Sequence, residues 1–326
     1  MHKSIAVPPK QGSPAGRSLI VRRARDRRAG RFLTALAILP VILILFIIIV
    51  LVVRSWPILE NQPLWNLLTG LDWHPARGNF GFYPFIIGTF WVTVLAMLLA
   101  VPPCLLTAIY LAEYARASTR ALMKPLIDLL AAIPSVVYGV WGMVAIVPWV
   151  EKSLAPFMGK WFGSIPLFKG TNPTGFSVMS GGIVLAVMVA PFIIAVTYEV
   201  LRAVPDGLRE ASLAVGATRW ETIKSAVIPS SIAGVIAGVV LGSSRALGET
   251  MAVMMVVGNV PIVPKSIFDP AYPLPALIAN NYGDMMSIPL YDAALLSAAL
   301  ILLVIVLIFN IISTLVLRQI IRRSKA

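Results

Sequence analysis

An arginine and a glutamate stand four residues apart inside an apolar stretch of the sequence. Arg245 and Glu249 lie in SSRALGETMAVMMVVGN, which follows Pro229 and is otherwise suited to lipid. Four residues make about one helical turn, so we expect both side chains on one face near the middle of a membrane span. An isolated charge at that depth costs at least about 2.5–3.5 kcal/mol. Each therefore needs a partner, water or a substrate beside it.

The chemistry that this pair offers is the transient recognition of an oxyanion. A guanidinium presents planar, paired donors to oxygens and stays charged at any working pH. We expect Arg245 to contact the anion and Glu249 to hold Arg245 when no anion is bound. The hydroxyls of Ser244 and Thr250 are additional candidates for the substrate path. The alternative is a buried ion pair that only fixes how this span packs.

Composition assigns the chain to the integral membrane proteins. Its 326 residues are 58% hydrophobic and 13% charged, which is far from the composition of an ordinary globular domain. The single cysteine, Cys104, lies in an apolar run, so we predict packing and neither a disulfide nor a thiolate metal site. With only His2 and His74 available, both outside the apolar runs, an intramembrane hydrolase lacks a base. We expect no cofactor.

Hydropathy predicts an all-α, polytopic membrane protein with six transmembrane helices. A disordered basic tail over residues 1–31 precedes a first span and outer loop over 32–84, and residues 85–326 supply five further spans. Of the 27 Lys and Arg residues, twenty fall on the side of the termini and six on the other side. Both termini are therefore predicted to be cytoplasmic. The expected spans cover residues 32–53, 85–111, 126–150, 181–203, 229–257 and 290–317.

A polar segment of about residues 205–224 lies between the fourth and fifth spans, on the cytoplasmic side. Small side chains at Ala211, Ala214 and Ala217 let a short helix approach a partner closely, and Gly216 suits a tight turn. Pro229, at the head of the next span, lacks an N–H that would be unpaired there. We predict a docking helix; the alternative is an amphipathic helix resting on the membrane.

This segment resembles the EAA motif of ABC-transporter permeases, written EAA-x3-G-x9-I-x-L-P. Glu210-Ala211-Ser212, Gly216 and Ala226-Val227-Ile228-Pro229 keep its spacing, with Ser212, Ala226 and Ile228 as conservative departures. The resemblance implies a type I ABC-permease-like fold and a helix that couples the spans to an ATPase. The coupling residues that it implies are Glu210, Ala211, Ala214, Gly216, Ala217, Arg219, Trp220 and Pro229.

From about Gly78 to the end, the chain is similar to phosphate ABC permeases of the PstC type. The similarity is carried by FGFYPFIIGT, IPSVVYGVWG and SSRALGETMAVMMVVGN. It implies a prokaryotic inner-membrane importer with a second permease of PstA type, an ATPase dimer of PstB type and an outer phosphate-binding protein of PstS type. The chain itself has no G-x-x-x-x-G-K-[ST] stretch, so it is not expected to be the ATPase.

The substrate and the lining of the path leave alternatives open. In a phosphate path, Glu249 would also accept a hydrogen bond from the proton of hydrogen phosphate, which sulfate lacks at neutral pH, yet Arg245 suits molybdate or sulfate as well. An ion-coupled secondary carrier would use the same pair but not a docking helix. Ser135 and Tyr138 lie in the third span, next to Pro134 and Gly139. These residues suit a path-lining helix and an ordinary packed helix equally.

Overall fold

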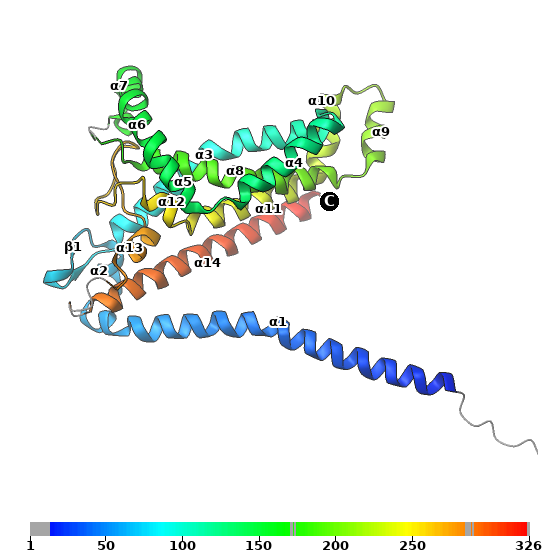
Figure 1. Ribbon diagram of the computed structural model, residues 1–326, viewed down its shortest axis with the longest axis horizontal. Coiled ribbons are helices and arrows are strands. Elements are labelled where there is room, and N and C mark those ends of the chain that lie inside the picture. Colours follow the sequence, from blue (N-terminus) through cyan, green and yellow to red (C-terminus); the bar gives the residue numbers. More distant parts are fainter. Residues whose placement is uncertain (1–13, 170–171, 173, 284–287, 289, 325–326) are drawn as a thin grey trace, which may run out of the picture. The chain divides into compact units, whose positions relative to one another are not determined.

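A computed structural model describes residues 14–169, 172, 174–283, 288 and 290–324 (Figure 1). The chain divides into two compact units, Met1–Val53 and Arg54–Ala326. The first consists of helix α1 (Pro14–Asn61) up to Val53, and it carries an apolar segment long enough to cross a membrane. Within the tail predicted to be disordered over residues 1–31, the structure describes helix from Pro14 onward, and residues 1–13 lie outside the described part. Ala and Arg favour helices, and extending an existing helix costs less than starting one.

The second unit is organised around one buried helix. Helix α8 (Val178–Arg202) lies against α3 (Tyr83–Ile109) and α11 (Ile228–Leu247), and α11 also packs on α14 (Tyr291–Ser324). Glycines on α11 allow the close contact with α8. A Cβ on Gly234 would lie 2.5 Å from Val200 Cγ1, and one on Gly242 would lie 2.7 Å from Ile193 Cγ1. Small residues of this kind let helix backbones approach each other inside a membrane.

The third predicted span is broken. Helix α4 (Ala117–Ala132) is followed at a 90° bend by the helical segment Ser135–Phe162. That segment contains α5 (Ser135–Trp141), α6 (Val147–Trp149) and α7 (Ala155–Phe162), joined by π-turns. Over the described residues, five helices are long and apolar enough to cross a membrane, or six if the bent pair forms one span. The predicted all-α membrane fold is confirmed, with a small hairpin added outside the spans.

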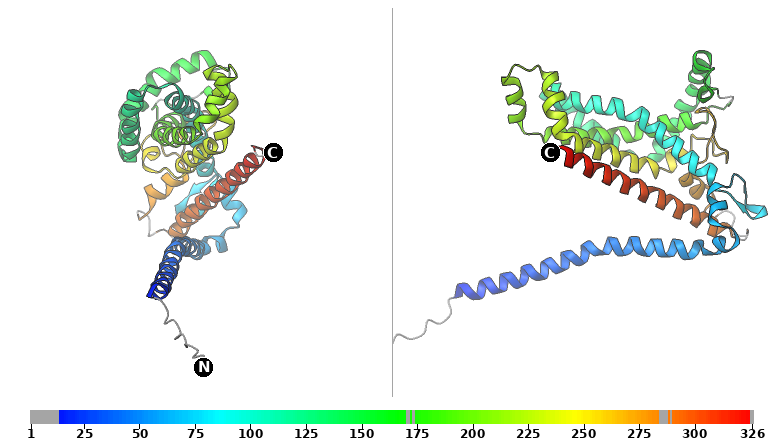
Figure 2. Two further views of the ribbon diagram at one scale, coloured as in Figure 1. Left: turned by 90° about the vertical axis from the view of Figure 1, so that its right-hand side faces the viewer. Right: turned by 180° about the vertical axis from the view of Figure 1, so that it is seen from behind.

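Loops predicted for the two sides of the membrane lie at opposite ends of the second unit. Helices α9 (Asp206–Ala214) and α10 (Arg219–Thr222) lie at the same end as the C-terminus (Figures 1 and 2). The other end holds α2 (Leu64–Thr69), the strands β1 (Trp73–His74) and β2 (Asn79–Phe80), α7, and α13 (Leu274–Asn281). This separation agrees with the sidedness predicted from the Lys and Arg count.

We call the end with α2, β1, β2, α7 and α13 the outer end, and the end with α9 and α10 the inner end, after the predicted sidedness. The outer end has its own aromatic core. Strands β1 and β2 pair antiparallel, with Trp73 opposite Phe80. The Trp73 ring lies 5.0 Å from the Phe85 ring centroid and 6.3 Å from that of Tyr291.

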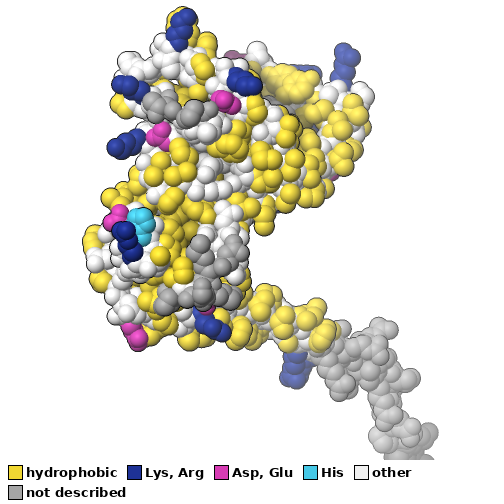
Figure 3. Space-filling model, turned by 60° about the vertical axis from the view of Figure 1, so that its left-hand side comes forward, with side chains coloured by type: hydrophobic (Ala, Val, Ile, Leu, Met, Phe, Trp, Pro, Cys, Tyr) yellow, Lys and Arg dark blue, Asp and Glu magenta, His cyan; other side chains and the backbone are white. Residues whose placement is uncertain are grey.

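Elsewhere on the face drawn in Figure 3, hydrophobic side chains form broad continuous areas with charged side chains at the margins. Such areas suit contact with lipid or with another membrane protein.

Candidate functional site

The fifth predicted span is interrupted beside the candidate charges. Helix α11 ends at Leu247 and the short α12 (Met251–Met254) follows, so Arg245 lies in the last turn of α11 and Glu249 lies in the break. Gly248 ends α11, and its N–H donates to the carbonyl of Arg245 at 3.3 Å. The prediction of one continuous helix over residues 229–257 is therefore wrong. The two charges are not on successive turns of one helix.

The expected pairing of Arg245 with Glu249 is absent from the described residues. Oε1 of Glu249 instead accepts a hydrogen bond from the N–H of Ala252 at 3.3 Å, at the start of α12. Arg245 is exposed in the isolated chain, and Cζ of its guanidinium lies 5.9 Å from the ring centroid of Phe192 on α8. The break turns the carboxylate toward unpaired backbone, and this leaves the guanidinium open to another partner.

The two neighbouring hydroxyl groups differ in their surroundings. The Oγ of Ser244 lies 3.0 Å from Oδ1 of Asn310 and 3.0 Å from the carbonyl of Val240, so it links α11 to α14. The Oγ1 of Thr250 donates to the carbonyl of Gly248 at 3.3 Å, within the break. Ser244 is thus engaged in helix packing, whereas Thr250 stays in the irregular segment next to Glu249.

The second interruption, before α5, lies against the first. The hydroxyl of Tyr138 donates to the carbonyl of Leu130 at 2.8 Å and so bridges the bend between α4 and α5. A Cβ on Gly139 would lie 3.2 Å from Cα of Ala252, which means that α5 and α12 are in close contact. Ser135, half-buried, opens α5. Ser135 and Tyr138 therefore lie on an element that contacts α12, the helix that directly follows Glu249 and Thr250.

The coupling segment folds as two short helices around a glycine turn. Gly216 follows α9 with φ +88°, in the left-handed region, and its N–H donates to the carbonyl of Leu213 at 3.0 Å. This is the tight turn expected of Gly216. Ala217 is half-buried. The other predicted coupling residues of the segment are exposed at the inner end: Glu210, Ala211, Ala214, Gly216, Arg219 and Trp220.

The departure from the motif at Ser212 has a structural role. The Oγ1 of Thr222 donates to Oγ of Ser212 at 3.0 Å, which ties α10 to α9 across the glycine turn. A capping box between Thr218 and Glu221 starts α10. Pro229 lies in the first turn of α11 as predicted, but helix continues into it from α10 through a π-turn, Ile223–Val227. The proline therefore follows existing helix, contrary to the idea that it begins one.

Sequence reasoning missed the residue that holds this segment in place. Nη2 of Arg209 lies 2.8 Å from Oε1 of Glu113, and both side chains are nearly buried, at 13% and 11% exposed. Nη2 also donates to the carbonyl of Leu201 at 2.8 Å, and Nη1 pairs with Asp206 at 3.0 Å. Hydrogen bonding to Glu113 raises the pKa of Arg209. The feature of the sequence that could have indicated this contact is Glu113, a carboxylate at the end of an apolar run.

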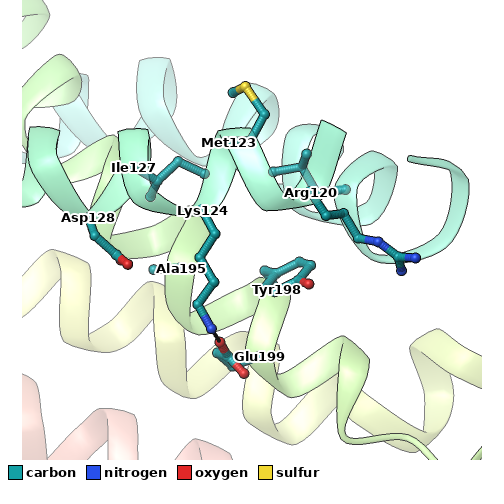
Figure 4. A pocket seen from close by; sticks show the side chains of 9 residues that line it. Arg120, Met123, Lys124, Ile127, Asp128, Ala195, Tyr198 and Glu199 are labelled. Carbon is teal, nitrogen blue, oxygen red and sulfur yellow. Dashed lines mark hydrogen bonds and ion pairs between the residues drawn. The ribbon is translucent and has the colours of Figure 1, made fainter. Parts of the chain in front are cut away.

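A second ion pair joins α4 to α8 nearer the surface. Nζ of Lys124 lies 2.7 Å from Oε1 of Glu199, and both side chains are more than half exposed. Figure 4 shows this pair at a groove between the two helices, with Arg120 and Tyr198 beside it. Two cations and two carboxylates, the second being Asp128, line the groove. These charges balance, so the groove offers no net attraction for an anion.

With this geometry in hand, comparison with known proteins identifies the family. Residues 104–323 match the family described as "Binding-protein-dependent transport system inner membrane component". The chain belongs to this family. It is 38% identical to the "Phosphate transport system permease protein PstC" of Pasteurella multocida, over 76% of this chain and 78% of that one. It is 35% identical to the protein of the same name from Xylella fastidiosa, over 98% of this chain and 99% of that one.

A solved structure shares the fold. It is a bacterial ABC transporter involved in the import of the acidic polysaccharide alginate, with a TM-score of 0.60 and 18% identity, covering 91% of this chain and 99% of the other. The family and the fold confirm a multi-pass permease subunit. The segment of α9 and α10, which carries the EAA-like spacing, lies inside the matched region.

Proposed function

We propose that this chain is a permease subunit of an ATP-driven phosphate importer in the inner membrane of a prokaryote. The names of its relatives support phosphate as the substrate. The observation that carries the coupled-transport part is the segment from α9 to α10 at the inner end of the molecule, which exposes large apolar side chains among charged ones. Leu213 is 46%, Val215 84% and Trp220 53% exposed. Apolar side chains gathered at such a place favour a protein partner.

A second permease follows from the position of Arg245. Its guanidinium is exposed in the isolated chain, and a charge facing lipid at this depth is costly. The face that carries it must therefore be covered by protein or must border water. A second permease of PstA type, closing a path against this face, satisfies both conditions.

Phosphate selection is assigned to the two charges acting separately. Arg245 contacts the anion with paired donors. Glu249 has a free lone pair beyond its bond to Ala252 N–H, so it accepts a hydrogen bond from the proton of hydrogen phosphate. Sulfate carries no such proton at neutral pH and would meet only repulsion from the carboxylate. Thr250, Ser135 and Tyr138 lie on the neighbouring elements and shape the path.

Energy comes from outside the chain. The sequence lacks the phosphate-binding loop of an ATPase, so an ATPase dimer of PstB type supplies the work. Closure of that dimer on ATP would carry α9 with it and open the spans outward, toward a phosphate-loaded binding protein of PstS type. Hydrolysis would reset the spans. An ion-coupled carrier is disfavoured, because it has no use for an exposed docking helix.

The test is uptake into proteoliposomes that contain both permeases, the ATPase and the binding protein. We expect ATP-dependent uptake of phosphate but not of sulfate or molybdate. Arg245→Gln and Glu249→Gln should abolish uptake while ATP hydrolysis persists, whereas Arg202→Gln, which changes an exposed arginine at the inner end, should leave uptake unchanged. Uptake of sulfate or molybdate in preference to phosphate would assign another anion. Normal phosphate uptake by both Gln variants would remove the path role.

A cross-linking measurement tests the coupling role independently. Ala214 is exposed on α9, and Ala214→Cys should form a cross-link to a cysteine placed on the ATPase surface in the assembled complex. The same cysteine at Gly159, on α7 at the outer end, is the matched control and should form none. A complex that transports without any cross-link at Ala214 would contradict the docking role of α9.

A further inference from the structure

Helix α9 lies against α10 and the π-turn Ile223–Val227, but its contact with the rest of the molecule is shallow. No residue of α9 is buried, and its half-buried residues are Arg209 and Ser212. Ser212 reaches only as far as α10, through Thr222. The hydrogen bonds of Arg209 are therefore the direct side-chain link from α9 to the ends of the membrane spans.

Arg209 binds two spans at once. Its Nε and Nη2 face the carboxylate of Glu113 side-on, at 3.2 Å to Oε2 and 2.8 Å to Oε1. Glu113 lies in the π-turn Tyr110–Tyr114 that ends the second span. Nη2 and Nη1 also donate to the carbonyls of Leu201 and Val204, at the end of α8. Leu201 lies in the last turn of α8, where a cation complements the helix dipole.

We infer that Arg209 is a positioning residue that transmits the movement of α9 to the second and fourth spans, with Glu113 as its anchor. This inference rests on the coupling role proposed for α9. A guanidinium is suited to the task because its planar donors fix direction as well as distance, which a lysine ammonium does not. Burial keeps water from replacing these hydrogen bonds while α9 moves. Without the pair, α9 can move with the ATPase while the second and fourth spans do not follow it.

The decisive variant removes both charges together. Breaking a buried ion pair on one side leaves an unpaired buried charge, whereas replacing both partners by apolar side chains is often tolerated. Glu113→Leu with Arg209→Met therefore keeps the fold while it removes the link. In the complete reconstituted complex, phosphate uptake per ATP hydrolysed should fall about tenfold, the order expected for residues that carry coupling between sites.

Two controls separate coupling from assembly. Asp206→Asn removes only the ion pair between Arg209 and Asp206, whose side chain is 78% exposed. This variant should leave uptake per ATP within about twofold of the unsubstituted complex. Arg209→Lys keeps the charge but not the planar fork, and should give an intermediate ratio. A purely structural role would lower the amount of complex and leave the ratio unchanged.

The outcomes divide clearly. A lowered ratio in the double variant, with the Ala214 cross-link to the ATPase retained, supports the inference. An unchanged ratio in the double variant overturns it and leaves the proposed function standing. Absence of the Ala214 cross-link in the otherwise unsubstituted complex removes the proposed coupling role, and this inference falls with it.

Discussion

The turn at Gly216 offers a quantitative test of how the coupling segment is built. Its φ of +88° lies in the left-handed region, and a Cβ added there would have no atom within 4 Å. Substitution with alanine therefore adds backbone strain and no steric clash. Gly207, on the preceding helix α9, also has open space around it but an ordinary backbone conformation. Gly207 is therefore a matched control for Gly216: both have room for a Cβ, and only Gly216 has a positive φ.

The size of the effect follows from that angle. A left-handed conformation costs a non-glycine residue about 1–2 kcal/mol. A change of this size shifts an equilibrium by a factor of about 5–30. Gly216→Ala should therefore raise the population of the open turn by this factor. Gly216→Asn should raise it less, because asparagine tolerates the left-handed region. Gly207→Ala should slightly favour the helix, since alanine is the better helix former.

Hydrogen exchange at Ala217 reads the turn directly. Its N–H donates to the carbonyl of Ser212 at 3.3 Å and is released when the turn opens. We expect exchange at this amide to accelerate about 5- to 30-fold in Gly216→Ala and to be unchanged or slower in Gly207→Ala. Phosphate uptake should decline in the same order. Equal exchange rates in the two alanine variants would refute the strain argument.

Two further predictions concern packing within the spans. Gly242→Val should destabilise the chain by about 1–3 kcal/mol, because its Cβ would meet Ile193 Cγ1. The thermal unfolding midpoint in detergent should therefore fall. Gly159→Ala is the control and should not change the midpoint, because Gly159 has open space around it. Tyr138→Phe removes the bond to the carbonyl of Leu130 and should cost about 0.5–1.5 kcal/mol by the same measurement. An unchanged midpoint in either variant would contradict the contact assigned to it.

The sequence was sufficient for features that depend on local pattern. Apolar runs of membrane length located the spans, and the Lys and Arg count separated the inner loops from the outer ones. The turn at Gly216 was predictable because glycine alone adopts a positive φ without strain. The exposed positions on α9 followed from the motif spacing. None of these features needs contacts between distant parts of the chain.

The breaks in the third and fifth spans were not predictable in the same way. Pro134 marked a possible bend, but its 90° angle depends on packing between α5 and α12, where Gly139 meets Ala252. The pairing of Arg245 with Glu249 was inferred from helical spacing, and it fails because α11 stops between them. Arg209 and Glu113 stand 96 residues apart in sequence. A single sequence gives no direct sign of such a contact.

The break after α11 also bears on why one chain is insufficient. Non-helical backbone at membrane depth is tolerated only where protein covers it or where it lines a water-filled cavity. Gly248 is exposed in the isolated chain, and so is Arg245 one turn earlier. Irregular backbone and a cation without an ion-pair partner among the described residues are thus both exposed in the isolated chain, and lipid is a poor environment for either. The second permease proposed above would close a polar path against this segment, and this links the position of the break to the function proposed for the chain.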